Sequence, residues 1–508
     1  MCINASILLV AISSAMPFAA RFGGRDIAVH EARVSAVPFN QVWAGFQRPK
    51  SQTKIAHFVS FDVAAPGDLE LTLPECAPED VRIFPLSRRN RLVRDGRRMA
   101  VFVDGPEQFV VDLAGETLHV FANPPFRHKH VAGELYFGPG VHDVGAIVPE
   151  SGQTVCIDEG AVVYGGIFVG RKSNVRVVGR GIVDSSRLRR LDGGGDEAVD
   201  GDMRLSKVLT RFGLGRGECG DVLAQTCFCA YASTNVTVEG VVFRDAPVWA
   251  VIVRNGCRGV SLDNVKLIGM WRYNSDGIDV CASEDTRIAN TFVRSFDDCI
   301  VARGASLLGE TGDLRNLTVE NCVLWCDWGK NLEIWAGSQP CLIDNVAYRR
   351  CMLVNVSHTA YSTTTWYGAK PTRIQNVVVE DLEVDIDGER PLPLLSSFRT
   401  DRYPGGRQKK VAIVSVDCGK LGRNLGNQQF GEPADMSEYD IVYSNITVRD
   451  IRVLGASDVA RVARIGSDVP PFRIERLCVE NVPDVSFEVK GGVDLVRPLP
   501  MTSPCPPQ

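Results

Sequence analysis

The chain has 508 residues, of which 45% are hydrophobic and 23% charged, so it can bury a large core and global disorder is excluded. Lys and Arg number 56 against 61 Asp and Glu, and a net charge of −5 excludes the basic stripe typical of nucleic-acid binders. The longest clean apolar stretch, Ile7–Ile12, is far shorter than the roughly 20 residues that cross a bilayer. We expect a soluble globular protein without nucleic-acid or membrane partners.

The N-terminus reads MCINASILLVAISSAMPFAA and faintly resembles a secretion signal, although it starts without positive charge. We expect residues 1–25 to be a leader or disordered segment and the location to be extracellular or periplasmic, with the cytoplasm as the alternative. Most of the 16 cysteines are expected to be buried hydrophobes, because several lie inside strand-like runs and the closest pairs lack CxxC spacing. No metal site or cofactor is predicted.

Residues 26–122 alternate short β-branched runs with Pro, Gly and Asp, as in HFVSFDVAAPGDLELTL and MAVFVDGPEQFVVDL. This pattern predicts antiparallel strands in a small β-sandwich-like domain. The polar, proline-containing segment 123–130 (NPPFRHKH) is a plausible junction to the next domain.

From residue 131 to 495 a different unit recurs, in which Asn or Gly is followed by alternating apolar residues and a turn. It reads NVTVEG at 235, GVSLDN at 259, TRIANT at 286 and NLTVEN at 316, a drifting period of about 24–30 residues. The repeat favours an all-β parallel solenoid, with the Asn amide bonding to the backbone of the next coil. An antiparallel array is the alternative. A Pro-rich tail, 496–508, follows.

Two segments interrupt this repeat. Leu191–Asp221 contains LDGGGDEAVDGD, and Asp385–Asp440 is rich in Pro, Gly and charge. Long loops in a compact fold are usually functional, so we expect walls or lids of a binding groove.

Acidic residues gather in WRYNSDGIDV and RSFDDCIVARG. We expect Asp276 and Asp279 at a turn and the adjacent Asp297 and Asp298 about one coil later, so that all four carboxyls share one face. Neighbouring strand residues point to opposite faces, so Asp297 and Asp298 can share a groove only at a bend. Crowded carboxyls raise one pKa, which suits a general acid beside a general base.

NSDGID followed by FDDC resembles the NTDG and DD motifs of the polygalacturonases, glycoside hydrolase family 28, whose fold is a right-handed parallel β-helix. The related dextranases and isopullulanases of family 49 add an N-terminal β-sandwich. The resemblance implies that Asp297 is the general acid, that Asp276 and Asp298 activate the water, and that hydrolysis inverts the anomeric centre.

The chain departs from the family downstream of these motifs. CDWGKNLEIWAG replaces the His-Gly element, and the substrate-binding Arg-Ile-Lys motif has no clear counterpart near NVSHTAYSTTTW. Lys330 or His358 is a candidate to tune the acid, with a surface role for His358 equally open. The remaining candidates for the substrate-binding groove are Asp279, Trp328, Glu333 and Arg303, whereas Trp325 is expected in the core.

The sequence thus predicts an inverting glycoside hydrolase acting on a polysaccharide or its oligosaccharides, either pectin-type or neutral α-glucan. A Ca²⁺-dependent β-helix lyase, with Lys330 or Arg303 as base, and a non-catalytic carbohydrate-binding solenoid are the alternatives. The sequence leaves oligomeric state and endo or exo action open.

Overall fold

The computed structural model describes residues 18–36, 50–74, 80–113, 116–188, 226–272, 274–305, 310–336, 340–356, 358–365, 371–386, 410–418, 440–455, 458–467, 472–491 and 493. Apart from two short 3₁₀ helices, η1 (Lys50–Gln52) and η2 (Leu86–Arg91), all elements in these ranges are strands. Within them, no helix is long and apolar enough to span a membrane. The tail and most of the two insertions lie outside the described residues.

The first ten strands form two five-stranded sheets that enclose their own apolar core. In sheet order, the first contains β2 (Arg25–Ile27), β1 (Ala19–Phe22), β5 (Gly67–Thr72), β8 (Arg98–Val103) and β7 (Leu92–Asp95). The second contains β3 (Val29–Ser35), β4 (Thr53–Asp62), β10 (Glu116–Asn123), β9 (Glu107–Leu113) and β6 (Arg82–Phe84).

Two expectations for this sandwich need correction. Residues 1–17 of the expected leader or disordered segment lie outside the described residues, whereas residues 19–25 belong to the sandwich, because β1 pairs with β5 and buries Ala20. The pairing is also not wholly antiparallel, since β4 and β10 run parallel. Four residues of β1 are too few to show alternation in the sequence, and only the long-range partner identifies them as a strand.

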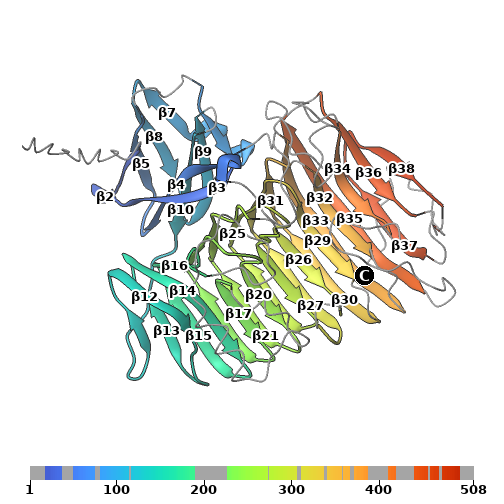
Figure 1. Cartoon of the computed structure of the whole chain (residues 1–508). Helices are drawn as coiled ribbons and strands as arrows, with labels where there is room; N and C mark the ends of the chain where they lie inside the picture. The colour runs from blue at the N-terminus through green and yellow to red at the C-terminus, as the bar shows by residue number, and fades with distance from the viewer. Residues whose placement is uncertain are drawn as a thin grey trace, which may run out of the picture.

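The remaining 28 strands form one continuous parallel sheet wound into a right-handed β-helix (Figure 1). Most coils contribute one strand to each of three stacks. Stack A contains β17 (Phe228–Tyr231), β20 (Val251–Arg254), β23 (Ile278–Cys281), β26 (Ile300–Arg303), β29 (Lys330–Ala336), β32 (Thr359–Thr365), β34 (Lys410–Val416), β36 (Ala460–Ile465) and β38 (Ser486–Val489).

Stack B contains β11 (Leu135–Phe137), β13 (Thr154–Ile157), β15 (Ser173–Gly179), β18 (Thr234–Glu239), β21 (Arg258–Asp263), β24 (Glu284–Ala289), β27 (Leu314–Glu320), β30 (Cys341–Arg349), β33 (Thr372–Ile386), β35 (Ile441–Gly455) and β37 (Phe472–Glu480). Stack C contains β16 (Ile182–Asp184), β19 (Val242–Arg244), β22 (Lys266–Ile268), β25 (Phe292–Ser295), β28 (Val323–Cys326), β31 (Met352–Val354) and the second halves of β33 and β35. β12 (Gly140–Ile147) and β14 (Ala161–Gly170) run through stacks C and A.

The recurring Asn lies within the stack B strands in the left-handed backbone conformation, with φ of 57° at Asn316 and 58° at Asn345. The Asn345 amide donates to the Asn316 side chain at 2.9 Å, and Asn445 donates to Asn376 at 2.7 Å. The amides therefore bond from side chain to side chain along the stack, and not to backbone as expected. Asn suits the position because its short polar side chain tolerates positive φ.

The sandwich covers the outer face of stack C, and in Figure 1 the blue strands lie against one flank of the solenoid. Phe84 packs edge-on against Trp325 at 5.8 Å between ring centroids, and both are buried. Trp325 is core as expected, but it lies outside the coil, beneath the sandwich. Behind it, Arg294 hydrogen-bonds His119 of β10 at 3.1 Å and pairs with Asp327 at 3.5 Å.

Candidate active site

The acidic residues meet where the chain leaves stack C and enters stack A. Asp276 precedes β23 and is followed by Gly277. Gly277 packs closely against the next coil, since an added Cβ would lie 2.4 Å from the Cys299 carbonyl oxygen. Asp279 lies within β23 and not at the turn that we expected. A strand residue at this position points out of the coil because its neighbours Ile278 and Val280 belong to the solenoid core.

The adjacent pair Asp297 and Asp298 lies on the next coil, at the bend between β25 and β26, as expected. Gly277 N–H donates to the Asp298 carbonyl at 2.8 Å, which places the two acidic segments side by side. Asp297 and Asp298 are 8% and 7% exposed and Asp276 is 1% exposed. The bend thus holds two neighbouring carboxyls at one nearly buried site, where each strongly perturbs the other.

A third turn closes the site from the following coil. An added Cβ at Gly329 would lie 2.5 Å from Asp298 Oδ1 and 2.6 Å from Asp297 Oδ1, so only glycine fits there without displacing the carboxyls. The next residue, Lys330, donates its backbone N–H to Asp298 Oδ1 at 2.7 Å. The element that departs from the family motif in sequence therefore contacts the acidic pair directly.

Arg303 at the end of β26 is not a solvated strand end. Its Nε donates to Asp279 Oδ1 at 2.5 Å and its second terminal nitrogen to Asp276 Oδ2 at 3.0 Å. The guanidinium lies over the rings of Trp249 and Trp335, at 4.2 and 4.9 Å from their centroids. One cation thus neutralises part of the charge of two buried carboxyls while aromatic rings fix its orientation.

The pKa of both partners of Arg303 is raised. Burial is the main cause for Asp279, whose pKa reaches about 7 against the opposing Arg303 charge. Burial and then repulsion from Asp279 and Asp297 raise the pKa of Asp276 well above its ordinary value. Asp276 Oδ1 and Asp279 Oδ2 have no hydrogen-bond partner within the described part of the chain.

Asp297 and Asp298 differ in protonation although they are neighbours. Burial, and then the Asp298 charge, raises the pKa of Asp297 to about 8. Burial also acts on Asp298, but the Lys330 charge, a hydrogen bond from Glu333 and the Arg303 charge outweigh it and lower its pKa. Near neutral pH the pair therefore combines one protonated and one ionised carboxyl, the combination that general acid–base chemistry requires.

Glu333 and Lys330 support the ionised member of the pair. Leu332 and Ile334 belong to the solenoid core, so Glu333 points outward as expected and is 2% exposed. Burial and the Asp298 charge raise the pKa of Glu333 well above its ordinary value, and a hydrogen bond joins the two carboxyl groups. Lys330 Nζ contacts the Glu333 carboxylate and lies 3.9 Å from Asp298 Oδ2.

Two further candidates border this cluster. Trp328 is partly exposed and stacks on the buried ring of Phe296 at 5.3 Å with an interplanar angle of 2°, a flat aromatic surface beside the acidic pair. His358 is half-buried, and burial followed by the Lys330 and Arg464 charges lowers its pKa to about 4. It is therefore neutral near pH 7 and within electrostatic reach of Lys330. Trp366, which follows His358 by eight residues in the sequence, lies outside the described residues.

The sequence reasoning did not identify Gly329 or Trp249. A glycine flanked by Trp and Lys carries no signal by itself, and its importance follows from the carboxyls that the previous coil places against it. Trp249 lies three coils before Trp335, and only the stacking of coils brings both to Arg303.

A solenoid with clustered, differently protonated carboxyls on its flank has the features of a carbohydrate-cleaving β-helix. Residues 197–383 match the model of "Glycosyl hydrolases family 28", a range that includes every candidate site residue. Over 159 residues, 30% of this chain, the sequence is 25% identical to an endopolygalacturonase of Emericella nidulans. The aligned part spans 39% of that relative. The central segment is therefore similar to family 28 glycoside hydrolases.

The whole chain is similar in fold to Dex49A from Penicillium minioluteum. The alignment covers 94% of this chain and 93% of Dex49A, with a TM-score of 0.54 and 13% identity. At this identity the similarity concerns the fold alone, along nearly the full length of both chains.

Proposed function

We propose that this protein is an inverting glycoside hydrolase that cleaves a polysaccharide or its oligosaccharides. The opposed pKa shifts of Asp297, to about 8, and of Asp298, below its ordinary value, are the observation that carries the proposal. A protonated carboxyl beside an ionised one provides the acid and the base of glycoside hydrolysis. The family 28 match over the same residues supports this assignment.

Asp297 then protonates the glycosidic oxygen of the leaving group. Asp298, kept ionised by Lys330 and Glu333, takes a proton from the attacking water on the opposite face of the sugar. Inverting glycosidases usually hold the acid and the base roughly 6.5–9.5 Å apart. Asp297 Oδ1 and Asp298 Oδ1 lie closer than that, because both are within 2.6 Å of one point beside Gly329, so we propose that Asp276 and Asp298 activate the water together. In this scheme Asp276 Oδ1 orients the water, because its other oxygen is held by Arg303.

The sugar at the cleavage point is proposed to be neutral. The two cations beside Asp297 and Asp298 already form ion pairs within the site. Arg303 pairs with Asp276 and Asp279, and Lys330 pairs with Glu333. A uronate carboxylate entering this site would have to compete with them. Trp328 on Phe296 provides an apolar face of the kind on which sugar rings stack.

Polygalacturonate is the second candidate substrate. It is supported by the similarity of the central segment to the endopolygalacturonase. Lys330 and Arg464 would then supply the positive charge near a galacturonate carboxylate, and the neutral His358 could hydrogen-bond it.

Reducing-end release tests the proposal on four polymers, polygalacturonate, rhamnogalacturonan, dextran and pullulan, each with and without a chelator. We expect chelator-insensitive release on one of them, an initial product of inverted anomeric configuration by NMR, and a loss of about 10²–10⁴-fold in Asp297→Asn. Asp68→Asn, on the exposed side of β5, is the matched control and should retain full activity.

Other outcomes would identify other functions. Chelator-sensitive release of a product that absorbs in the ultraviolet would indicate a lyase. Glycan binding without release on any polymer, unchanged in Asp297→Asn, would indicate a non-catalytic solenoid. We further propose an extracellular or periplasmic location, where such polymers occur, and fractionation of the native host for the protein tests it.

A further inference from the structure

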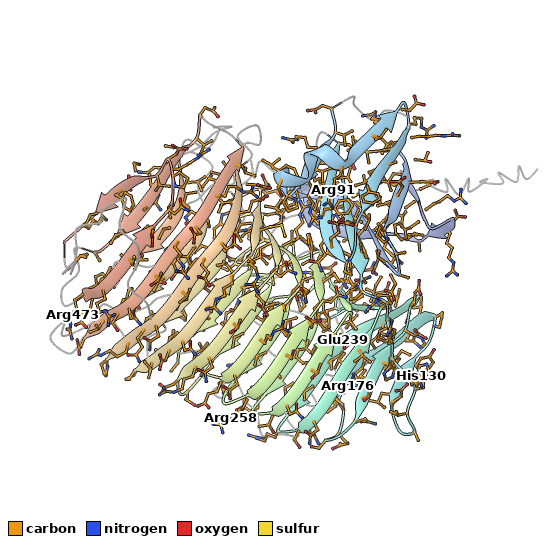
Figure 2. All side chains as sticks on the ribbon, turned by 180° about the vertical axis from the view of Figure 1, so that it is seen from behind. Arg91, His130, Arg176, Glu239, Arg258 and Arg473 are labelled. Carbon is orange, nitrogen blue, oxygen red and sulfur yellow. The ribbon has the colours of Figure 1, made fainter. Side chains whose placement is uncertain are left out.

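A second cluster of chemically active side chains lies far from the acidic site, where the sandwich joins the solenoid. The segment between β10 and β11 carries His128, His130 and Glu134, and it lies over Cys156 of β13. Figure 2 labels His130 at the end of the solenoid where its first coils lie. None of these four residues takes part in the proposed hydrolysis.

The donor atoms of these four side chains converge. The ligand atoms of His128, His130, Glu134 and Cys156 all lie within 4.8 Å of one another. His128 Nε2 is 2.9 Å from one Glu134 oxygen, and His130 Nδ1 contacts the other. The side chains of His128 and Glu134 are only 7% and 4% exposed, while His130 is 56% exposed and leaves one side of the cluster open.

The position of Cys156 is the unusual feature. Val155 and Ile157, its neighbours in β13, belong to the solenoid core, so the Cys156 side chain points out of the coil. It is nevertheless fully buried, and it forms no disulfide. Most cysteines of the solenoid point inward and act as small hydrophobes, whereas this thiol faces two imidazoles and a carboxylate.

Hydrogen bonds from the two histidines to Glu134 would by themselves fasten the segment to the first coil. Those bonds account for the burial of the Glu134 carboxylate, since a buried charge requires partners. They do not account for a thiol at the same point. Two imidazole nitrogens, a carboxylate oxygen and a sulfur are together the donor set of a tetrahedral zinc ion.

We propose that His128, His130, Glu134 and Cys156 form a binding site for a divalent transition-metal ion of the zinc type. The ion would hold the segment between β10 and β11 against the first coils of the solenoid. Ligand bonds of about 2.0–2.3 Å require the four donor atoms to approach to about 3–4 Å of one another. Small side-chain rotations suffice, with the metal taking the place of the hydrogen bonds between Glu134 and the histidines. The Cys156 thiol releases its proton to solvent as the sulfur–metal bond forms, so acid weakens binding.

Cobalt is the probe, because tetrahedral Co²⁺ absorbs visible light and a thiolate ligand adds a near-ultraviolet charge-transfer band. The full chain is stripped with a chelator, titrated with Co²⁺, and then with Zn²⁺. We expect saturation at one equivalent, both bands, and displacement by Zn²⁺. Cys156→Ser should lose the charge-transfer band, and Cys156→Ser and His128→Ala should each weaken binding at least about 10-fold.

His142→Ala is the matched control, since His142 lies in the adjacent β12 and its Nε2 contacts the Gly138 carbonyl at 2.7 Å outside the cluster. Its cobalt spectrum and affinity should equal those of the unmodified chain. Zn²⁺ should also raise the thermal unfolding temperature of the unmodified chain but not that of Cys156→Ser. A cooperative unfolding transition of the metal-free variant shows that it is folded before metal is added.

Absence of a stoichiometric tetrahedral spectrum would overturn the proposal, as would a spectrum that Cys156→Ser and His128→Ala leave unchanged. An ion held at the acidic site would give no charge-transfer band and would be lost in Asp298→Asn. Because the readout is metal binding, the result does not depend on whether the chain hydrolyses glycans.

Discussion

At the scale of single residues, the proposed function depends on the different surroundings of two neighbouring carboxyls. Asp297 and Asp298 share the same bend and the same burial, yet only Asp298 receives the Lys330 backbone N–H and the Glu333 hydrogen bond. The difference in pKa follows from these contacts. Substitutions at the bend should therefore affect activity and stability in opposite directions.

Asp297→Asn should stabilise the folded protein while lowering activity by about 10²–10⁴-fold. Because the folded pKa of Asp297, about 8, lies above its unfolded value near 4, folding at neutral pH requires proton uptake, and Asn removes that cost. The carboxyl's contribution to stability is complete below pH 4 and is lost as the pH rises toward 8. We expect a gain on the order of 1–3 kcal/mol at pH 7 that disappears near pH 4.

Urea unfolding of both proteins between pH 4 and 8 measures this difference. A gain that does not vary with pH would contradict the assignment of a raised pKa to Asp297. Activity of the unmodified enzyme should fall above pH 8, as the acid loses its proton.

Gly329→Ala should reduce activity about 100-fold, because the new Cβ would lie 2.5–2.6 Å from an oxygen of each carboxyl and must displace them. Initial rates on the identified substrate measure the effect. Gly105→Ala is the control, since nothing lies within 4 Å of a Cβ added there. Equal activities of the two variants would show that the turn does not position the pair.

At the scale of elements, the candidate site is supported by buried residues of strands that lie beneath the sandwich. Arg294 of β25 is 1% exposed, and its guanidinium lies 4.3 Å from the centroid of the Trp325 ring. It also pairs with Asp327, the residue that precedes the turn Trp328–Lys330. His119 of β10 accepts a hydrogen bond from the same guanidinium and is neutral, because burial lowers its pKa well below the ordinary value. One buried ion pair thus links β10, β25 and β28 to the active-site turn.

Arg294→Met should lower the free energy of unfolding by about 3–5 kcal/mol, because it leaves the buried Asp327 carboxylate without its cation. The comparison is Arg287→Met on β24, whose pair with Glu320 is partly solvent-exposed and worth at most about 1 kcal/mol. Denaturant unfolding measures both. If the two variants lost equal stability, the link through Asp327 would have no energetic basis.

At the scale of the whole molecule, sandwich and solenoid share a buried apolar interface that includes Phe84, Phe121, Phe292 and Trp325. Two units joined in this way should unfold together, because unfolding of either one would expose the apolar interface of the other to water. The outer face of stack C is therefore part of the common core and not a surface of the solenoid.

Calorimetry should show one unfolding transition for the unmodified chain, whereas Phe84→Ala should separate it into two. The substitution removes an aromatic ring that is 1% exposed, at a cost of about 3–5 kcal/mol localised to the interface. Phe102→Ala, at a ring that is 44% exposed, should leave the single transition in place. Two resolved transitions in the unmodified chain would mean that the units unfold independently.

The sequence by itself determined the solenoid, the acidic motifs and the two-part organisation. These features depend on local information: the Asn-led alternating runs specify strands and turns, and NSDGID and FDDC are contiguous. Their one-coil separation also follows from the repeat length. The outward direction of Glu333 was predictable for the same reason, because strand alternation is local.

Only the tertiary structure decided what each group does. The Arg303 ion pairs, the fit of Gly329 against the carboxyls, the covering of Trp325 by the sandwich and the approach of Cys156 to His128 all join residues on different coils or units. Burial and neighbouring charge set a pKa, and both come from the stacking of coils, which no short stretch of sequence specifies.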